Sequence, residues 1–92
     1  MSIRAFLLNK GFNPKFKGFD CIEKGIELIS EDRKYLRNIS KVLYPKISEE
    51  LQIKYHNIDR NIRNCVKASG MKITCAQLFA ILEIEYSALG DK

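Results

Sequence analysis

Residues 40–67, SKVLYPKISEELQIKYHNIDRNIRNCVK, carry the pattern that decides the fold. The segment predicts a short helix over about residues 45–51, a turn over 52–55 and a second helix over about 56–68. Pro45 suits the first turn of a helix, where the N–H that proline lacks would have no partner in any case. In the second helix, residues at i, i+4, i+7 and i+8 form one apolar face, namely Ile58, Ile62, Cys65 and Val66.

The opposite face of the second helix collects basic and amide side chains. At about 100° per residue, it carries His56, Asn57, Arg60, Arg63, Asn64 and Lys67. Arginine and asparagine are well suited to bind phosphates and to read guanine or adenine edges in a major groove. We therefore interpret residues 44–68 as a helix-turn-helix whose second helix enters DNA.

Positive charge is concentrated in the same part of the chain. The 92 residues are 46% hydrophobic and carry a net charge of +5 at pH 7. Residues 52–72 hold five Lys/Arg against one Asp/Glu, whereas residues 73–92 hold one against three. A local basic excess is what nucleic-acid binding requires, although a solvated basic helix would give the same count.

The rest of the chain predicts more helices and no β-sheet, because alternating apolar and polar runs are absent. Ser2 can cap a first helix that runs to about Lys10. A second helix is expected over about residues 19–30, with Gly25 at a close helix crossing. Asp32 can cap a third, shorter helix that carries Tyr35, Leu36 and Ile39. The expected fold is one all-α domain over residues 1–92, a compact bundle of about five to six helices.

Gly70 is expected to end the second helix of the helix-turn-helix, and the last helix is expected over residues 75–89. Thr74 and Gln77 match a capping box at its start. It carries two apolar stripes, of which the first would serve the core: Cys75, Leu78, Phe79, Leu82, Tyr86 and Leu89. The second stripe, Ile81, Ile84 and Ala88, either packs on a neighbouring helix or forms a homodimer contact.

Several classes of function find no support in the sequence. The three cysteines, Cys21, Cys65 and Cys75, form no C-x-x-C pair, so reduced core thiols in a cytoplasmic protein are expected. His56 is the only histidine, which argues against a metal site, and no apolar run approaches the ~18 residues of a membrane span. No nucleophile–base pair, carboxylate dyad or phosphate loop points to an enzyme, a cofactor or a small-molecule substrate.

Four short motifs resemble a known family. They are Lys17-Gly18-Phe19, Gly25-Ile26, the octapeptide S-K-V-L-Y-P-K-I of residues 40–47 and Arg60-Asn61-Ile62-Arg63. Over residues 11–68 they resemble the C-terminal DNA-binding domain of the stage-zero sporulation response regulator family. The resemblance implies an all-α fold of about six helices and sequence-specific binding to promoter DNA.

The chain also departs from that family. The family's N-terminal phosphoacceptor receiver domain is missing, and an initial Met with the polar end Gly90-Asp91-Lys92 favours a stand-alone protein. The tail after Ala68 is shorter, and Asn57 replaces an arginine, so the preferred DNA sequence should differ. These departures leave a rival interpretation open, in which a protein-interaction module keeps the fold but binds a partner regulator rather than DNA.

The sequence thus predicts two sets of DNA contacts. Arg60 is the best base reader, because its planar fork can donate two bonds to guanine. Asn57 either pairs with adenine or caps the helix. Asp59 either accepts from cytosine or favours the helix N-terminus through the macrodipole. The base-reading candidates are His56, Asn57, Arg60, Asn61 and Asn64, and the phosphate-binding candidates are Lys41, Lys46, Lys54, Arg63 and Lys67.

Overall fold

The structure, a computed structural model, describes residues 2–90. The interpretation of the chain ends concerns residues outside this range, namely Met1, Asp91 and Lys92. The described part contains no strand, so the all-α prediction is confirmed, and none of its helices is long and apolar enough to cross a membrane. Its elements are α1 (Ile3–Asn9), α2 (Lys17–Glu31), α3 (Lys34–Arg37), a π-helical turn η1 (Ile39–Leu43), α4 (Tyr44–Leu51), α5 (Tyr55–Ser69) and α6 (Cys75–Gly90).

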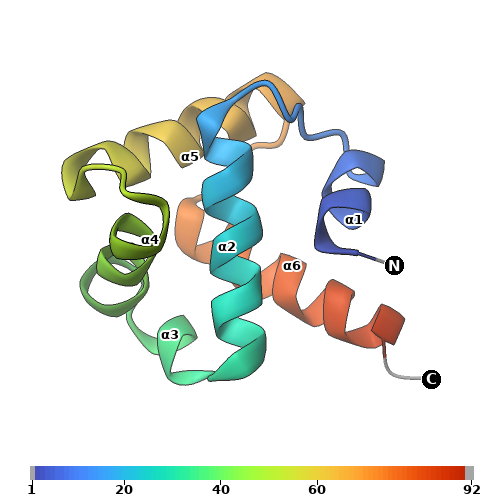
Figure 1. The fold of residues 1–92 in the computed structure, drawn as a ribbon. Coiled ribbons are helices and arrows are strands. Elements are labelled where there is room, and N and C mark those ends of the chain that lie inside the picture. Colours follow the sequence, from blue (N-terminus) through green and yellow to red (C-terminus); the bar gives the residue numbers. More distant parts are fainter. Residues whose placement is uncertain (1, 91–92) are drawn as a thin grey trace.

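Helix α2 runs through the centre of the molecule (Figure 1). Helix α5 crosses its N-terminal end, α3 lies near its C-terminal end, α1 lies on the side away from α4, and α6 passes behind α2 to end on that same side. The apolar face of α2 supplies much of the core, as the i, i+4, i+7 spacing of Ile22, Ile26 and Ile29 predicts. The largest fully buried side chains are Phe19, Phe79, Leu7, Ile22, Ile26, Ile29, Leu43, Ile47, Ile58, Ile62, Leu78 and Leu82.

Two glycines let α2 approach its neighbours closely. A Cβ at Gly25 would overlap the ring of Phe79 in α6, so the predicted close crossing is confirmed. A Cβ at Gly18 would overlap the backbone carbonyl of Asn61 in α5. This second crossing was not predicted, because α2 begins at Lys17 and not near Phe19 as expected.

The predicted helix ends are confirmed at three places. The Ser2 hydroxyl accepts a bond of 3.1 Å from the Ala5 N–H at the start of α1. At the start of α6, the Gln77 N–H donates to Thr74 Oγ1 at 3.1 Å and the Thr74 N–H donates to Gln77 Oε1 at 3.0 Å. Gly70, with φ of +87°, ends α5. These bonds satisfy backbone groups that have no partner within the helix.

The prediction of one short helix extending to Ile39 is wrong. Helix α3 ends at Arg37, and Asn38 is extended, with φ of −146°. The side chain of Asn38 then accepts a bond of 3.1 Å from the Lys41 N–H and starts η1. The N–H of Tyr44 bonds to the carbonyl of Ile39, five residues back, so η1 leads directly into α4.

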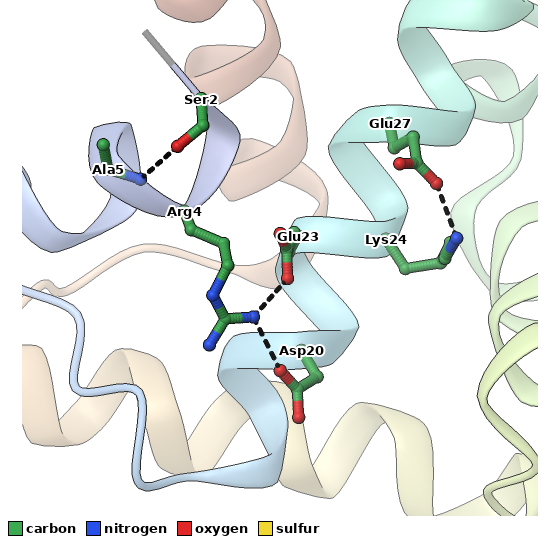
Figure 2. A network of polar contacts seen from close by, with 7 residues as sticks. All are labelled: Ser2, Arg4, Ala5, Asp20, Glu23, Lys24 and Glu27. Atoms are coloured by element: carbon green, nitrogen blue, oxygen red, sulfur yellow. Dashed lines mark hydrogen bonds and ion pairs between the residues drawn. The ribbon is translucent and has the colours of Figure 1, made fainter.

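Ion pairs on the outer face of α2 orient α1 against it (Figure 2). Arg4 of α1 donates to Glu23 at 2.6 Å and to Asp20 at 3.2 Å, and Lys24 donates to Glu27 at 2.5 Å within α2. Exposed pairs of this kind contribute about 0–1 kcal/mol each. The two bonds of Arg4 therefore position α1 on α2 more than they stabilise the fold, and the Lys24–Glu27 bond lies within α2.

The two stripes of α6 behave differently. Leu78, Phe79 and Leu82 are buried and Tyr86 packs on Phe6, but Leu89 is 42% exposed, so its assignment to the core is wrong. In the second stripe Ile81 is 41% and Ile84 61% exposed, and Ala88 is exposed, so the prediction that this stripe packs on a neighbouring helix is wrong. The C-terminal end of α6 extends beyond α2 (Figure 1), and the buried residues Leu78, Phe79 and Leu82 leave the stripe of Ile81 and Ile84 open.

One carboxylate is buried on α6. Glu83 is 2% exposed and accepts bonds from Arg33 at 2.9 Å and from Ser87 at 2.6 Å. An unpaired buried carboxylate would destabilise the fold, and Arg33 and Ser87 offset that cost. Arg33 lies between α2 and α3, so its bond to Glu83 also joins this connection to α6.

Candidate nucleic-acid interface

Helices α4 and α5 are joined by the short turn of residues 52–54. Gln52 takes the left-handed conformation, with φ of 56°, and ends α4. The Ile53 N–H donates to the Ser48 carbonyl at 3.2 Å, and the Ser48 hydroxyl donates to the Ile53 carbonyl at 2.5 Å. Leu51 and Ile53 are half-buried against the core. These contacts fix the two helices in the arrangement of a helix-turn-helix.

Helix α5 has one buried and one open face. Ile58, Ile62, Cys65 and Val66 are buried, as the spacing predicts. Asn57 and Asn61 are half-buried at the edges of this face. The other candidates on the helix are exposed: His56, Arg60, Arg63, Asn64 and Lys67.

The interpretation of Asn57 as the helix cap is wrong. Lys54 holds the cap position, and Asn57 is the third residue of α5. No side chain caps this helix end. Instead, the Tyr55 hydroxyl donates to the carbonyl of Ser40 at 2.5 Å and ties the start of α5 to η1. The amide oxygen of Asn57 lies 3.5 Å from the Arg60 guanidinium, which is at the limit of a hydrogen bond.

Asp59 is bonded from two sides. Its carboxylate accepts a bond of 3.0 Å from the hydroxyl of the buried Tyr44 and forms an ion pair with Arg63 on α5. Burial works against the charged form, but the bonds from Arg63 and Tyr44 outweigh it, so the pKa of Asp59 lies below its ordinary value. Asp59 also lies beyond the first turn of α5, which contradicts its interpretation as a macrodipole group.

The phosphate-binding candidates differ in their surroundings. Lys46 pairs with Glu49 at 3.0 Å and with Glu50 at 3.5 Å, and Arg63 pairs with Asp59. Within residues 2–90, the remaining candidates are exposed and form no ion pair: Lys41, Lys54 and Lys67.

The sequence interpretation missed two side chains near this surface. Tyr55 was assigned to the turn, although it is the first residue of α5 and orients that helix through Ser40. Lys72, in the loop after α5, lines a surface hollow together with Arg63 and Lys67. The basic excess of residues 52–72 includes Lys72 and was the available signal, but charge counts do not show where a loop residue lies.

The cysteines differ in their surroundings, and Cys75 lies beside Tyr44 and Asp59. Cys21 and Cys65 are buried and Cys75 is half-buried, all three as free thiols. Burial raises the pKa of Cys21 to about 11. No group of three potential metal ligands occurs in the part of the chain that the structure describes.

A six-helix domain with a basic helix exposed after a short turn belongs to the class of helical DNA-binding domains. Residues 3–88 match the protein family described as sporulation initiation factor Spo0A C terminal. The chain therefore belongs to this family, the DNA-binding domain of a sporulation regulator, which is not a family of enzymes. The match includes α1 and most of α6, and so extends beyond residues 11–68, where the motifs were recognised.

Proposed function

We propose that this chain is a sequence-specific DNA-binding transcription regulator that inserts residues 56–68 of α5 into the major groove. The observation that carries the proposal is the two-faced structure of α5, with apolar residues in the core and arginine, lysine, histidine and asparagine side chains open to solvent. A major groove admits one helix of this width, so an open basic face can reach base edges and both flanking backbones.

The base contacts are assigned to Arg60 and to the histidine and asparagine side chains along α5. Arg60 is exposed, has no carboxylate partner in the described range and can donate two bonds to guanine O6 and N7. Asn57, Asn61 and Asn64 have amides that can pair with adenine, and His56 can reach a base or a phosphate. The half-buried Asn57 and Asn61 would read only bases that come close to the helix edge.

The proposed phosphate-binding residues differ in how freely they can bind a phosphate. Lys41, Lys54 and Lys67 are open and can bind phosphates without losing a partner. Lys46 and Arg63 must give up carboxylate partners, or share their charge with them, when they bind DNA. We therefore expect the first three to contribute more to the salt dependence of binding.

Selection of bound duplexes from a random pool is the experiment that tests sequence-specific binding. The expected result is an enriched motif, with affinity for it that falls steeply as salt rises. A module that binds only a partner regulator would enrich no motif and would show little salt-dependent affinity for any duplex. That result would contradict the proposal.

We further propose that the chain forms a homodimer through α6. Ile81, Ile84 and Ala88 make an exposed apolar stripe that a second copy would cover with its own identical stripe, as two-fold symmetry requires. Dimeric helix-turn-helix proteins bind two half-sites about 34–36 Å apart, so a dimer would gain affinity from paired sites.

A further inference from the structure

The loop of residues 70–74, between α5 and α6, is fixed at both ends. After Gly70 the N–H of Met71 donates to Ser69 Oγ at 3.3 Å, and the Ser69 hydroxyl donates to the Val66 carbonyl at 2.6 Å. At the other end Thr74 takes part in the capping box of α6. The backbone of this loop therefore has a defined position relative to the C-terminal half of α5.

Burial alternates along the loop. Met71 and Ile73 are half-buried and pack against the core, whereas Lys72 between them is exposed. Because its two neighbours point inward, the side chain of Lys72 projects outward from an anchored backbone. A lysine on a fixed backbone loses less conformational freedom on binding than one on a mobile loop.

Lys72 lines a surface hollow of about 290 Å³ beside α5. Its other polar lining comes from Arg63, Asn64 and Lys67, and its apolar lining from Val66, Met71 and Ile73. None of its lining residues is acidic. The hollow thus combines three cations and an amide, a set of donors that favours an anion.

The three cations are not equally available. The charge of Arg63 is shared with Asp59, whereas neither Lys67 nor Lys72 forms an ion pair within residues 2–90. Lys67 is one of the proposed phosphate-binding residues. Lys72 lies in the loop that follows α5 and lines the same hollow as Lys67, so the two side chains share one surface.

We propose that Lys72 binds a DNA backbone phosphate adjacent to the one that Lys67 binds, so that the loop of residues 70–74 extends the interface beyond α5. This inference rests on the proposed DNA-binding function. It adds a contact that sets affinity and the register of the protein on the duplex, and that reads no base.

The test measures affinity for a mixed-sequence duplex of about 25 base pairs over a range of potassium chloride concentrations. Each phosphate contact contributes about 0.9 to the slope of log affinity against log salt. Lys72→Gln should reduce the magnitude of this negative slope by about 0.9 and weaken binding roughly five- to ten-fold at 0.1 M salt. Lys67→Gln should do the same, and the double variant should lose about twice as much slope.

Two control variants show whether the change in slope depends on the charge at residue 72 or on the net charge of the protein. Lys72→Arg keeps the cation and should keep the slope of the unmodified protein. Lys10→Gln removes one positive charge at the α1–α6 contact, where Lys10 pairs with Glu85, and should leave the slope unchanged. Circular dichroism of each variant verifies that the fold is retained.

The outcomes separate this inference from the proposed function. If Lys72→Gln has the slope of Lys10→Gln while Lys67→Gln lowers it, the Lys72 contact does not exist and DNA binding by α5 stands. If the unmodified protein shows no salt-dependent affinity for any duplex, the proposed function fails and the inference fails with it.

Discussion

The hydroxyl of Tyr44 donates a hydrogen bond of 3.0 Å to the carboxylate of Asp59, and so links the first residue of α4 to the exposed side of α5. Tyr44 is 4% exposed, and its bond therefore reaches outward from the core to a group at the surface. On its other side Asp59 pairs with Arg63. Asp59 thus holds a cation of the proposed DNA surface in a position that the core determines.

Tyr44→Phe should destabilise the protein by about 1 kcal/mol, because Asp59 loses a donor while the packing of the buried ring is kept. Urea denaturation at pH 7 measures the free energy of unfolding. A matched substitution, Tyr35→Phe, alters a half-buried tyrosine of α3 and should have less effect. Equal effects of the two variants would show that the Tyr44–Asp59 bond has no net value.

The stability of the protein should depend on the charge of Asp59 in acid. Its pKa in the folded state lies below the ordinary value of 3.8, so its contribution is complete above that value and is lost as the pH falls through the folded pKa. Unfolding measured from pH 6 to pH 2 should therefore show a smaller acid loss for Asp59→Asn than for the unmodified protein. Identical pH profiles would contradict the lowered pKa.

Arg60→Ala should weaken binding to the preferred duplex by roughly 1–3 kcal/mol and relax discrimination at one base pair. The side chain is exposed, so the fold should be unaffected. Fluorescence anisotropy with the selected duplex and with single-base variants of it measures both effects. A uniform loss on all duplexes would reassign Arg60 to the phosphate backbone.

Gly25→Ala and Gly18→Ala should both destabilise the fold, and Gly18→Ala should cost more. The added methyl at Gly25 meets the side chain of Phe79, which can shift, whereas at Gly18 it meets the backbone of Asn61. Overpacking of this kind costs about 1–3 kcal/mol, and contact with backbone lies at the upper end. Thermal denaturation gives the order. Gly25→Ala combined with Phe79→Leu should recover part of the loss, and no recovery would refute the steric cause.

Ile84→Glu should prevent self-association without changing monomer stability by more than about 0.5 kcal/mol, because Ile84 is 61% exposed. Leu8→Glu is the control, since Leu8 is 50% exposed on α1, about 200° around that helix from the buried Phe6. Sedimentation equilibrium of the three proteins tests the contact. A monomeric unmodified protein at millimolar concentration would exclude the α6 dimer.

Local patterns in the sequence were sufficient to predict much of the fold and to predict which face of α5 is buried and which is open. The apolar spacing on α5 and the Thr74–Gln77 capping box depend on neighbours in sequence, and the structure has both. The end of α5 at Gly70 follows from the same local chemistry. These features were predictable because each is determined within one or two helical turns.

The features that the sequence did not reveal depend on contacts between distant residues or lack a local signal. The start of α2 was misplaced because Phe16 at its cap position makes no side-chain bond, so no capping pattern marks it. The Tyr44–Asp59 bond joins residues 15 positions apart and follows from the packing of α4 on α5. The exposure of the second stripe on α6 could not be decided, since a pattern of apolar residues does not show whether a neighbouring helix covers it.

The contacts of α2 have a consequence for any paired form of the protein. Gly18 and Gly25 lie about two turns apart and therefore on one side of α2. Gly18 packs against α5, and Gly25 packs against α6. In the proposed dimer, two subunits joined by their C-terminal helices would transmit that geometry to the two copies of α5 that are proposed to bind DNA. The packing inside one subunit would then set the separation of the two half-sites that the proposed dimer can span, and altering either glycine would change that separation.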